Sequence, residues 1–354
     1  MQNYVGQQIA HYRILERLGL GGMAVVYKAY DIRLERDVAV KLIRTDEIPS
    51  SQHQRLLKRF EQEAKAQARF SHPNIIPAYD FGEFDDIPYL VLAYMPGGTL
   101  KDRIQGPMPV DDALEIIIPI ADAIAYAHHN GVLHRDIKPS NILFSQENVP
   151  MLTDFGIAKV LEPNEGTLTG TGLGVGTPEY MAPEQWQGKA SDASDQYALG
   201  VLFYEMITGH KPYTAETPLA VAIKQINEPL QRPRHFVPNI PEDVEKIIFK
   251  TLALEPDDRF ESVESLCNRL VSLKDELEDK FIESVRVEKE NLKAEEALES
   301  REPIIHPEAD TRDDLDDVIS NSEVTPRREF APSVPAVAER KPEVKQTIKK
   351  TRLK

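Results

Sequence analysis

Two short polar motifs carry the residue types that phosphate chemistry requires. The segment HRDIKPSN, residues 134–141, sets Asp136, Lys138 and Asn141 at fixed offsets, and DFG begins thirteen residues later, at Asp154. An aspartate can accept the proton of an alcohol, a lysine can contact a phosphate, and an asparagine with a second aspartate can hold Mg²⁺. Either motif alone could occur by chance, but both in this order predict phosphoryl transfer to a hydroxyl group.

A glycine-rich segment near the N-terminus is a candidate phosphate-binding loop. LGLGGMAVV, residues 18–26, places Gly19, Gly21 and Gly22 between two strand-like segments. Glycine lets backbone N–H groups approach phosphate oxygens without an intervening Cβ. The segment is not a Walker A loop, because no Gly-Lys-Ser/Thr follows, and not a Rossmann fingerprint, because a strand comes next. Taken alone, it fits a phosphate loop and an ordinary hairpin turn equally well.

Lys41 ends the apolar strand VAVK, where an isolated lysine is usually just solvated. Glu63 changes that interpretation, because it lies three residues after Phe60 and seven after Leu56, on or beside the inward stripe of a predicted helix. A carboxylate on that face needs a partner, since an unpaired buried charge is strongly destabilising. We therefore expect Lys41 and Glu63 to pair, which would aim Lys41 at a phosphate.

The elements that position these residues change character along the chain. β-Branched and aromatic residues between turn signals predict strands over residues 12–19, 24–31, 37–43 and 89–94. A helix is expected from about 51 to 70, and helical patterns dominate after residue 96. Residues 197–207 are apolar almost all round, which predicts the buried central helix of a large helical lobe.

Composition narrows the class of protein. The chain has 354 residues, of which 41% are hydrophobic, enough for a sizeable core, and a formal net charge of −16. The basic footprint of a nucleic-acid-binding protein is missing, so no nucleic-acid partner is expected. Cys267 is the only cysteine, which rules out an intrachain disulfide, indicates a reducing compartment and is interpreted as core filler. Without a signal-peptide pattern or a long apolar run, a cytoplasmic protein is expected.

Three zones follow a short N-terminal lead, residues 1–10. Residues 11–273 alternate strand-like and helix-like patterns, residues 274–302 are densely charged without Gly or Pro, and residues 303–354 are rich in Pro, Ser, Asp and Glu. The composition of the last zone predicts a disordered tail, and that of the middle zone a charged helix. Near their junction Leu266, Leu270, Leu273 and Leu277 are spaced four, three and four residues apart. This spacing fits a helix packed on the lobe, a short coiled-coil seam or simply a solvated helix.

Seven motifs occur in one order along residues 12–273: LGLGGMAVV, VAVK, Glu63, HRDIKPSN, DFG, GTPEYMAPE and PDDRF. In this the chain resembles the eukaryotic-type (Hanks-type) serine/threonine protein kinases, and within them the bacterial receptor-type kinases. The resemblance implies an α+β, bilobal protein kinase fold, with a small β-rich N-lobe over 11–95 that contains one long helix and a larger, mainly helical C-lobe over 96–273. It also implies a signalling enzyme that transfers the γ-phosphate of ATP, with Mg²⁺, to Ser/Thr hydroxyls of protein substrates, and a homodimer through the N-lobe.

The same resemblance implies a role for each motif residue. Asp136 orients the substrate hydroxyl and accepts its proton, and Lys138 contacts the transferring phosphate and marks the Ser/Thr rather than the Tyr branch. Asn141 and Asp154 bind Mg²⁺, and Lys41 with Glu63 completes the catalytic set. The residues implied to bind ATP are Leu18, Gly19, Gly21, Gly22, Val26, Ala39, Lys41, Ala93, Met95 and Leu143. Among them Val26, Ala39 and Leu143 would sandwich the adenine.

The segment between DFG and APE is implied to carry regulation. Thr167, Thr169 and Thr171 stand in a Gly-rich run and match autophosphorylation sites, while Thr177 matches the threonine beside the catalytic aspartate. Each phosphate adds about −1.5 to −2 charges and can pair with an arginine, here Arg135. The alternative is that these threonines only suit a mobile loop.

Several residues are implied to serve the scaffold. Glu184 and Arg259 match the ion pair between APE and the late helical lobe, and Asp195 matches the residue that caps the catalytic loop. The remaining structural residues are Arg135, Phe155 and Gly156.

Three positions depart from the family pattern. Ala24 replaces the third glycine of the phosphate loop, Ala93 replaces a common hinge glutamate, and Gln67 stands where many kinases place an apolar spine residue. The last change implies an active conformation that depends more on loop phosphorylation or a partner. No catalytic residue is missing, which argues against a pseudokinase scaffold. The APE segment and its arginine argue against a small-molecule kinase.

The extreme C-terminus is basic, in contrast to the acidic whole. Its cationic residues are Arg340, Lys341, Lys345, Lys349, Lys350, Arg352 and Lys354. In similar receptor kinases such a segment precedes a membrane helix, so we expect either a natural soluble form or a chain cut just before the span. The basic end predicts contact with an anionic membrane surface.

Overall fold

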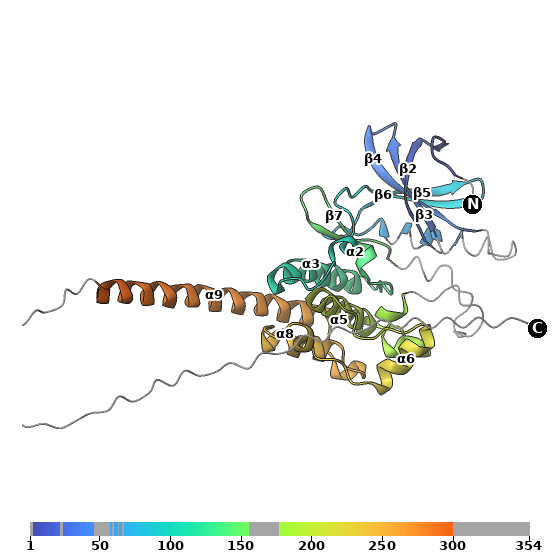
Figure 1. Ribbon diagram of the computed structural model, residues 1–354. Helices are drawn as coiled ribbons and strands as arrows, with labels where there is room; N and C mark the ends of the chain where they lie inside the picture. Colours follow the sequence, from blue (N-terminus) through green and yellow to red (C-terminus); the bar gives the residue numbers. More distant parts are fainter. Residues whose placement is uncertain are drawn as a thin grey trace, which may run out of the picture. The chain divides into compact units, whose positions relative to one another are not determined.

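The computed structural model describes residues 3–21, 24–45, 57–58, 60–62, 64–65, 67–155 and 177–299, with side chains to residue 293 (Figure 1). Its N-terminal part is a six-stranded antiparallel sheet with the order β1-β2-β3-β4-β6-β5. The strands are β1 Gln8–Ile9, β2 Tyr12–Leu20, β3 Ala24–Asp31, β4 Arg36–Ile43, β5 Ala78–Phe84 and β6 Ile87–Ala93. The four predicted strands correspond to β2, β3, β4 and β6, whereas β1 and β5 were not predicted.

Strand β4 is buried on both faces because a core cluster covers each side of the sheet. Val38, Val40 and Leu42 belong to one cluster, and Ala39 and Ile43 belong to the other. Side chains alternate between faces along a strand. Lys41 therefore lies on the face of Ala39 and Ile43.

Several described residues between 57 and 67 are helical, and two of their side chains cover the face of the sheet on which Lys41 lies. Phe60 and Ala64 belong to the same cluster as Ala39 and Ile43. The remainder of the helix predicted over 51–70 lies largely outside the described residues. The part that is described places an apolar stripe against the sheet, as its spacing predicted.

The rest of the described chain is mainly helical (Figure 1). Its helices are α2 Leu100–Arg103, α3 Val110–His129, α5 Asp192–Thr208, α6 Pro218–Asn227, α7 Pro233–Phe236, α8 Glu242–Thr251 and α9 Val263–Glu299. Short 3₁₀ turns are η1 Pro139–Asn141, η2 Pro178–Tyr180, η3 Pro183–Gln187 and η4 Pro256–Asp258, and a small hairpin joins β7 Ile142–Phe144 to β8 Pro150–Leu152. Helix α5 is buried almost all round and packs against α3 and α8, so the predicted central helix is confirmed.

Helix α9 continues across the boundary at 273/274 that the composition predicted. Leu266, Leu270 and Leu273 are buried in the helical core, and Leu277 packs against it. Beyond that point Phe281 is 69% exposed, so the helix has left the core. No helix within the described residues is long and apolar enough to cross a membrane.

Candidate active site

The HRD segment is held by one buried carboxylate from α5. Asp195, which is 2% exposed, accepts hydrogen bonds from the backbone N–H of His134 at 2.8 Å and of Arg135 at 2.7 Å. Arg135 has a φ of +66°, in the left-handed region that costs a non-glycine residue about 1–3 kcal/mol. His128 Nε2 also lies 2.9 Å from Asp195. These contacts stabilise a loop conformation that its own sequence would not prefer.

Asp136 is fixed from two sides by the residues that follow it. Lys138 Nζ donates to both of its carboxylate oxygens, at 2.9 and 2.7 Å. Asn141 Nδ2 donates to the Asp136 carbonyl at 2.8 Å and to its Oδ2 at 3.0 Å. The turn η1 brings Asn141 back toward Asp136, so the three motif residues form one cluster. The carboxylate is left hydrogen-bonded and partly exposed.

Asp154 lies opposite Lys41 of strand β4. Lys41 Nζ donates to Asp154 Oδ1 at 2.6 Å, and Asp154 has a φ of +71°. Burial works to raise the pKa of Asp154, but the Lys41 charge and hydrogen bond outweigh it and hold the pKa below its usual value. Asp154 is thus an anionic oxygen ligand beside a buried cation.

The expected partner of Lys41 was Glu63, which lies outside the described residues. The Lys41–Glu63 pair therefore stays a prediction. The Lys41–Asp154 contact was not predicted. Asp154 lies two residues after the end of β8 and 113 residues after Lys41 in the sequence, so no spacing pattern links the two and only the tertiary structure reveals the contact.

Behind Asp154, three rings pack one on the next. His134 is fully buried, with its ring 4.7 Å from that of Phe155, and Phe155 lies 5.1 Å from Phe70. Burial lowers the pKa of His134, whose Nε2 lies 2.9 Å from the Thr153 carbonyl. His134 is therefore a buried packing residue that ties the HRD and DFG segments together.

Gln67 is 2% exposed, and its amide nitrogen has no hydrogen-bond partner among the described residues. A buried unpaired amide is costly. The expectation that Gln67 makes the active conformation more dependent on loop phosphorylation or a partner stays a prediction.

The side chains implied to hold adenine lie in one apolar cluster under β4 and β6. Ala39, Leu92 and Ala93 are core members, and Val26, Met95 and Leu143 pack against them. Strands β3, β4, β6 and β7 each contribute at least one of these residues. Apolar side chains on the face of the sheet that also carries Lys41 are the type of surface that an aromatic base next to a phosphate chain requires.

The glycine-rich loop is described in part. A Cβ added at Gly19 would meet no atom within 4 Å, and one at Gly21 would meet only the Ala24 carbonyl at 3.5 Å. Packing among the described residues therefore does not require glycine at these two positions, and the expected phosphate contact stays a prediction. Leu18 is 44% exposed, and Gly22 lies outside the described residues.

Glu184 and Arg259 form a bidentate ion pair deep in the helical part. Arg259 Nη1 and Nη2 lie 2.8 and 2.9 Å from the two carboxylate oxygens, and Ser194 donates to Glu184 at 2.8 Å. Burial works to raise the pKa of Glu184, but the hydrogen bonds from Arg259 and Ser194 outweigh it and hold that pKa low. The pair joins η3 to the turn after η4, far apart in sequence.

The predicted regulatory residues are only partly described. Thr177 is half-buried at the start of η2 and its carbonyl accepts from the Tyr180 N–H at 3.1 Å. Thr167, Thr169, Thr171 and Gly156 lie outside the described residues.

A polar cluster next to η2 was missed at the sequence level. Tyr180 donates a hydrogen bond to Glu205 of α5, and burial raises the pKa of both groups. Lys211 Nζ lies 3.4 Å from Glu179 and 5.2 Å from the centre of the Tyr180 ring. No spacing rule connects residues 179–180 with 205 and 211, so no sequence signal marked this cluster.

Comparisons with known proteins match this geometry. The family model described as protein kinase domain covers residues 12–271. The chain is 41% identical over 266 residues to the serine/threonine-protein kinase PrkC of Bacillus subtilis, covering 74% of this chain and 40% of that protein. It is 37% identical over 267 residues to the serine/threonine-protein kinase PknB of Mycobacterium tuberculosis, covering 73% and 42%. The chain thus spans about two fifths of the length of these relatives.

A solved structure agrees with the same assignment. The kinase domain of PknI from Mycobacterium tuberculosis superposes with a TM-score of 0.59 at 26% identity, covering 77% of this chain and 99% of that one. The expected bilobal fold is confirmed by this similarity together with the β-sheet and helical parts described above. The chain belongs to the protein kinase domain family.

Proposed function

We propose that this chain is a bacterial serine/threonine protein kinase that transfers the γ-phosphate of ATP to Ser/Thr hydroxyls of proteins. The observation that carries the proposal is the pair of hydrogen bonds that Lys138 and Asn141 donate to the Asp136 carboxylate. It is accompanied by the Lys41–Asp154 contact of 2.6 Å. These residues supply a proton acceptor, a phosphate contact and metal ligands within one cluster. That combination serves phosphoryl transfer to an alcohol.

In the proposed mechanism Asp136 receives the proton of the substrate hydroxyl as the oxygen attacks phosphorus. Lys138, already hydrogen-bonded to Asp136, balances negative charge on the transferring group. Lys41 orients the phosphate chain from β4. Positioning and charge stabilisation supply most of the rate in this reaction class.

The donor set fits the implied Mg²⁺. Mg²⁺ prefers one or two carboxylate or amide oxygens together with substrate phosphates, and Asp154 and Asn141 offer that type of ligand. When bound, Mg²⁺ neutralises charge on the phosphates. The apolar cluster of Val26, Ala39 and Leu143 fits the adenine of ATP.

We further propose that the kinase is activated by autophosphorylation in trans at Thr167, Thr169 and Thr171. Arg135 would receive the phosphate charge, since it adjoins the catalytic aspartate. Thr177 would line the site for the substrate hydroxyl. The N-lobe homodimer, the cytoplasmic location and the division of the chain at residues 10, 273 and 302 stay predictions.

The test is incubation of the full chain with ATP and Mg²⁺, followed by mass-spectrometric mapping of phosphosites. We expect phosphate on Ser and Thr side chains, with Thr169 and Thr171 among the sites. Asp136→Asn is the control, because it keeps the shape of the side chain and removes the proton acceptor. Equal phosphate incorporation in this variant, or phosphate on Tyr alone, would contradict the proposal.

A further inference from the structure

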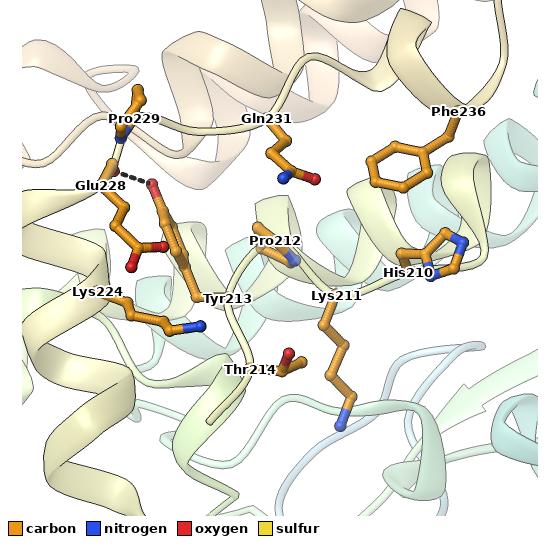
Figure 2. A pocket seen from close by; sticks show the side chains of 10 residues that line it. All are labelled: His210, Lys211, Pro212, Tyr213, Thr214, Lys224, Glu228, Pro229, Gln231 and Phe236. Carbon is orange, nitrogen blue, oxygen red and sulfur yellow. Dashed lines mark hydrogen bonds between the residues drawn. The ribbon is translucent and has the colours of Figure 1, made fainter. Parts of the chain in front are cut away.

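A hollow of about 480 Å³ lies among α6, α7 and the segment that follows α5 (Figure 2). None of the proposed catalytic or ATP-binding residues that the structure describes lines it. Tyr213 forms part of its wall and donates a hydrogen bond to the Glu228 carbonyl at 3.2 Å, shown as the dashed line in Figure 2. Since this bond links the segment after α5 to the end of α6, the wall of the hollow is a defined feature of the fold.

The hollow carries one lysine, Lys224, that has no ion-pair partner among the described residues. Lys224 is half-buried on α6 and extends toward Tyr213 in Figure 2, and no carboxylate of the described residues forms an ion pair with it. Glu228 is the one acidic side chain on the wall. An ammonium placed in a hollow without a partner is available to an incoming anion.

A second hollow adjoins the first through Gln231, which lines both. Arg232 in it is paired with Glu245, but Arg234 forms no ion pair within the described part of the chain. The Nε of Arg234 donates to the Ile240 carbonyl at 3.1 Å, which holds its guanidinium stem in place. Lys224 and Arg234 are thus two cations without an ion pair among the described residues, on a chain whose formal net charge is −16. The Glu245 carboxylate lies near Arg234, since it accepts a hydrogen bond from the Arg234 backbone N–H at 3.4 Å.

Lys211 connects this surface to the segment that we propose faces the substrate. It lines the first hollow, and its Nζ lies 3.4 Å from Glu179 of η2, two residues after Thr177. The aromatic and proline walls, Pro212, Tyr213 and Phe236, add apolar contact area. The hollow therefore lies next to η2, which follows the proposed substrate residue Thr177, and it combines cationic and apolar side chains of the kind that hold an acidic peptide.

We propose that this surface docks an acidic segment of the protein substrate, distinct from the segment that carries the phosphorylated hydroxyl. The inference depends on the proposed kinase function. Asp or Glu side chains of the substrate pair with Lys224 and Arg234, while its apolar side chains contact Pro212 and Phe236. Tethering a substrate at a second site raises the effective concentration of its hydroxyl at Asp136.

The experiment compares two peptide substrates on the full chain. One is a short peptide around a mapped phosphosite, and the other carries the same sequence joined by a Gly/Ser linker to an Asp/Glu-rich extension. We expect the extension to lower KM by about tenfold and to leave kcat within about twofold, because docking adds binding without changing the chemistry. Equal KM values for the two peptides would overturn the proposal.

Two variants locate the effect. Lys224→Ala and Arg234→Gln should each raise KM for the extended peptide by about threefold to fivefold. Both should leave activity on the short peptide unchanged. Lys101→Ala, an exposed lysine on α2, is the matched control and should keep the full advantage. An advantage that survives in the Lys224→Ala, Arg234→Gln double variant would overturn the assignment.

A binding assay separates this proposal from the kinase proposal. A fluorescent Asp/Glu-rich peptide that lacks Ser, Thr and Tyr is titrated with the wild-type chain and with the double variant. If the wild-type chain binds the peptide and the double variant does not, docking is supported even if neither substrate peptide is phosphorylated. If the substrate peptides are phosphorylated but the acidic peptide does not bind, the docking proposal is refuted and the kinase proposal stands. Binding of anionic vesicles in place of the peptide, lost in the same variant, would assign the surface to lipid and overturn the proposal.

Discussion

Asp136, the proposed catalytic base, owes its orientation to hydrogen bonds from two residues of its motif, Lys138 and Asn141. Lys138 Nζ and Asn141 Nδ2 donate to Asp136, while Asp195 holds the preceding backbone. These groups leave the Asp136 side chain few rotamers. A proton acceptor that is already positioned loses less conformational entropy on the way to the transition state, which lowers the activation barrier.

We predict that Asp136→Asn lowers kcat by about 10²–10⁴-fold, since that is the usual loss when a positioned general base is removed. The affinity for ATP should be retained, because the amide keeps the size of the carboxylate. Steady-state kinetics and nucleotide titration measure the two effects. A variant that keeps wild-type kcat would refute the role of Asp136.

The ion pair of Glu184 and Arg259 gives a second prediction for single residues. Glu184→Gln should lower the free energy of unfolding at neutral pH by about 3–5 kcal/mol, because the buried Arg259 charge loses its counter-ion. Urea denaturation measures this loss. The exposed pair of Lys246 and Glu242 is the control, and Lys246→Gln should cost at most about 1 kcal/mol.

The same pair predicts the direction of a pH effect. The pKa of Glu184 is held below its usual value, so the pair stabilises the fold above the unfolded pKa of about 4.3 and loses that contribution as pH falls through the folded pKa. The stability difference between wild type and Glu184→Gln should therefore shrink below about pH 4. A difference that stays constant down to pH 3 would contradict this.

At the scale of elements, the contact between α5 and α8 requires a residue without a side chain. A Cβ on Gly200 of α5 would lie 2.8 Å from Thr251 Cγ2 and 3.0 Å from Leu252 Cδ2. Thr251 is 1% exposed and its hydroxyl is bonded to the Ile247 carbonyl, so it has little room to move. The helices approach closely because Gly200 stands at their contact.

Gly200→Ala should therefore destabilise the protein. Overpacking costs about 1–3 kcal/mol and exceeds the gain in helix propensity of up to about 1 kcal/mol. Urea denaturation should show a lower midpoint with an unchanged slope. Gly106→Ala is a matched control, because a Cβ there meets no atom within 4 Å, and a similar loss in both variants would argue against the packing explanation.

At the scale of the whole molecule, the core ends partway along α9. Leu266, Leu270 and Leu273 are buried, whereas Phe281 and Ile282 are 69% and 65% exposed. Burying each leucine contributes about 1.5–3 kcal/mol, so three of them approach the total stability of a typical domain, about 5–15 kcal/mol.

Two truncations test this division. A chain ended after residue 279 should keep its unfolding midpoint within a few degrees, whereas one ended after residue 261 should lose cooperative unfolding. Differential scanning calorimetry measures both. Equal midpoints for the two chains would show that α9 does not complete the core.

The basic end of the chain supports a prediction about lipid. Each Lys or Arg near an anionic surface contributes about 1 kcal/mol, and residues 340–354 hold seven of them. The full chain should pellet with anionic vesicles, and a chain without residues 340–354 should pellet less. Neutral vesicles are the control, and equal pelleting of both chains would refute the contact.

Much of the site was predictable because kinase chemistry places it in short motifs. HRDIKPSN and DFG need only local spacing to specify Asp136, Lys138, Asn141 and Asp154, and alternation along β4 sets the face on which Lys41 lies. Likewise α5 was predictable, since a helix that is apolar all round can only be buried. Residues 167–171 and Glu63 lie outside the described part, so their expected roles still depend on the resemblance alone.

Contacts between distant segments could only come from the tertiary structure. Lys41 with Asp154, Tyr180 with Glu205, and Lys211 with Glu179 join elements whose separation obeys no period, and their pairing follows from how the elements pack. The hollow around Lys224 has the same origin, because its walls come from α6, α7 and the segment after α5. The sequence by itself thus determined the family, and with it the proposed reaction and the residues proposed to carry it. Packing decided which charged side chains form ion pairs, and which, such as Lys224, have no ion-pair partner among the described residues.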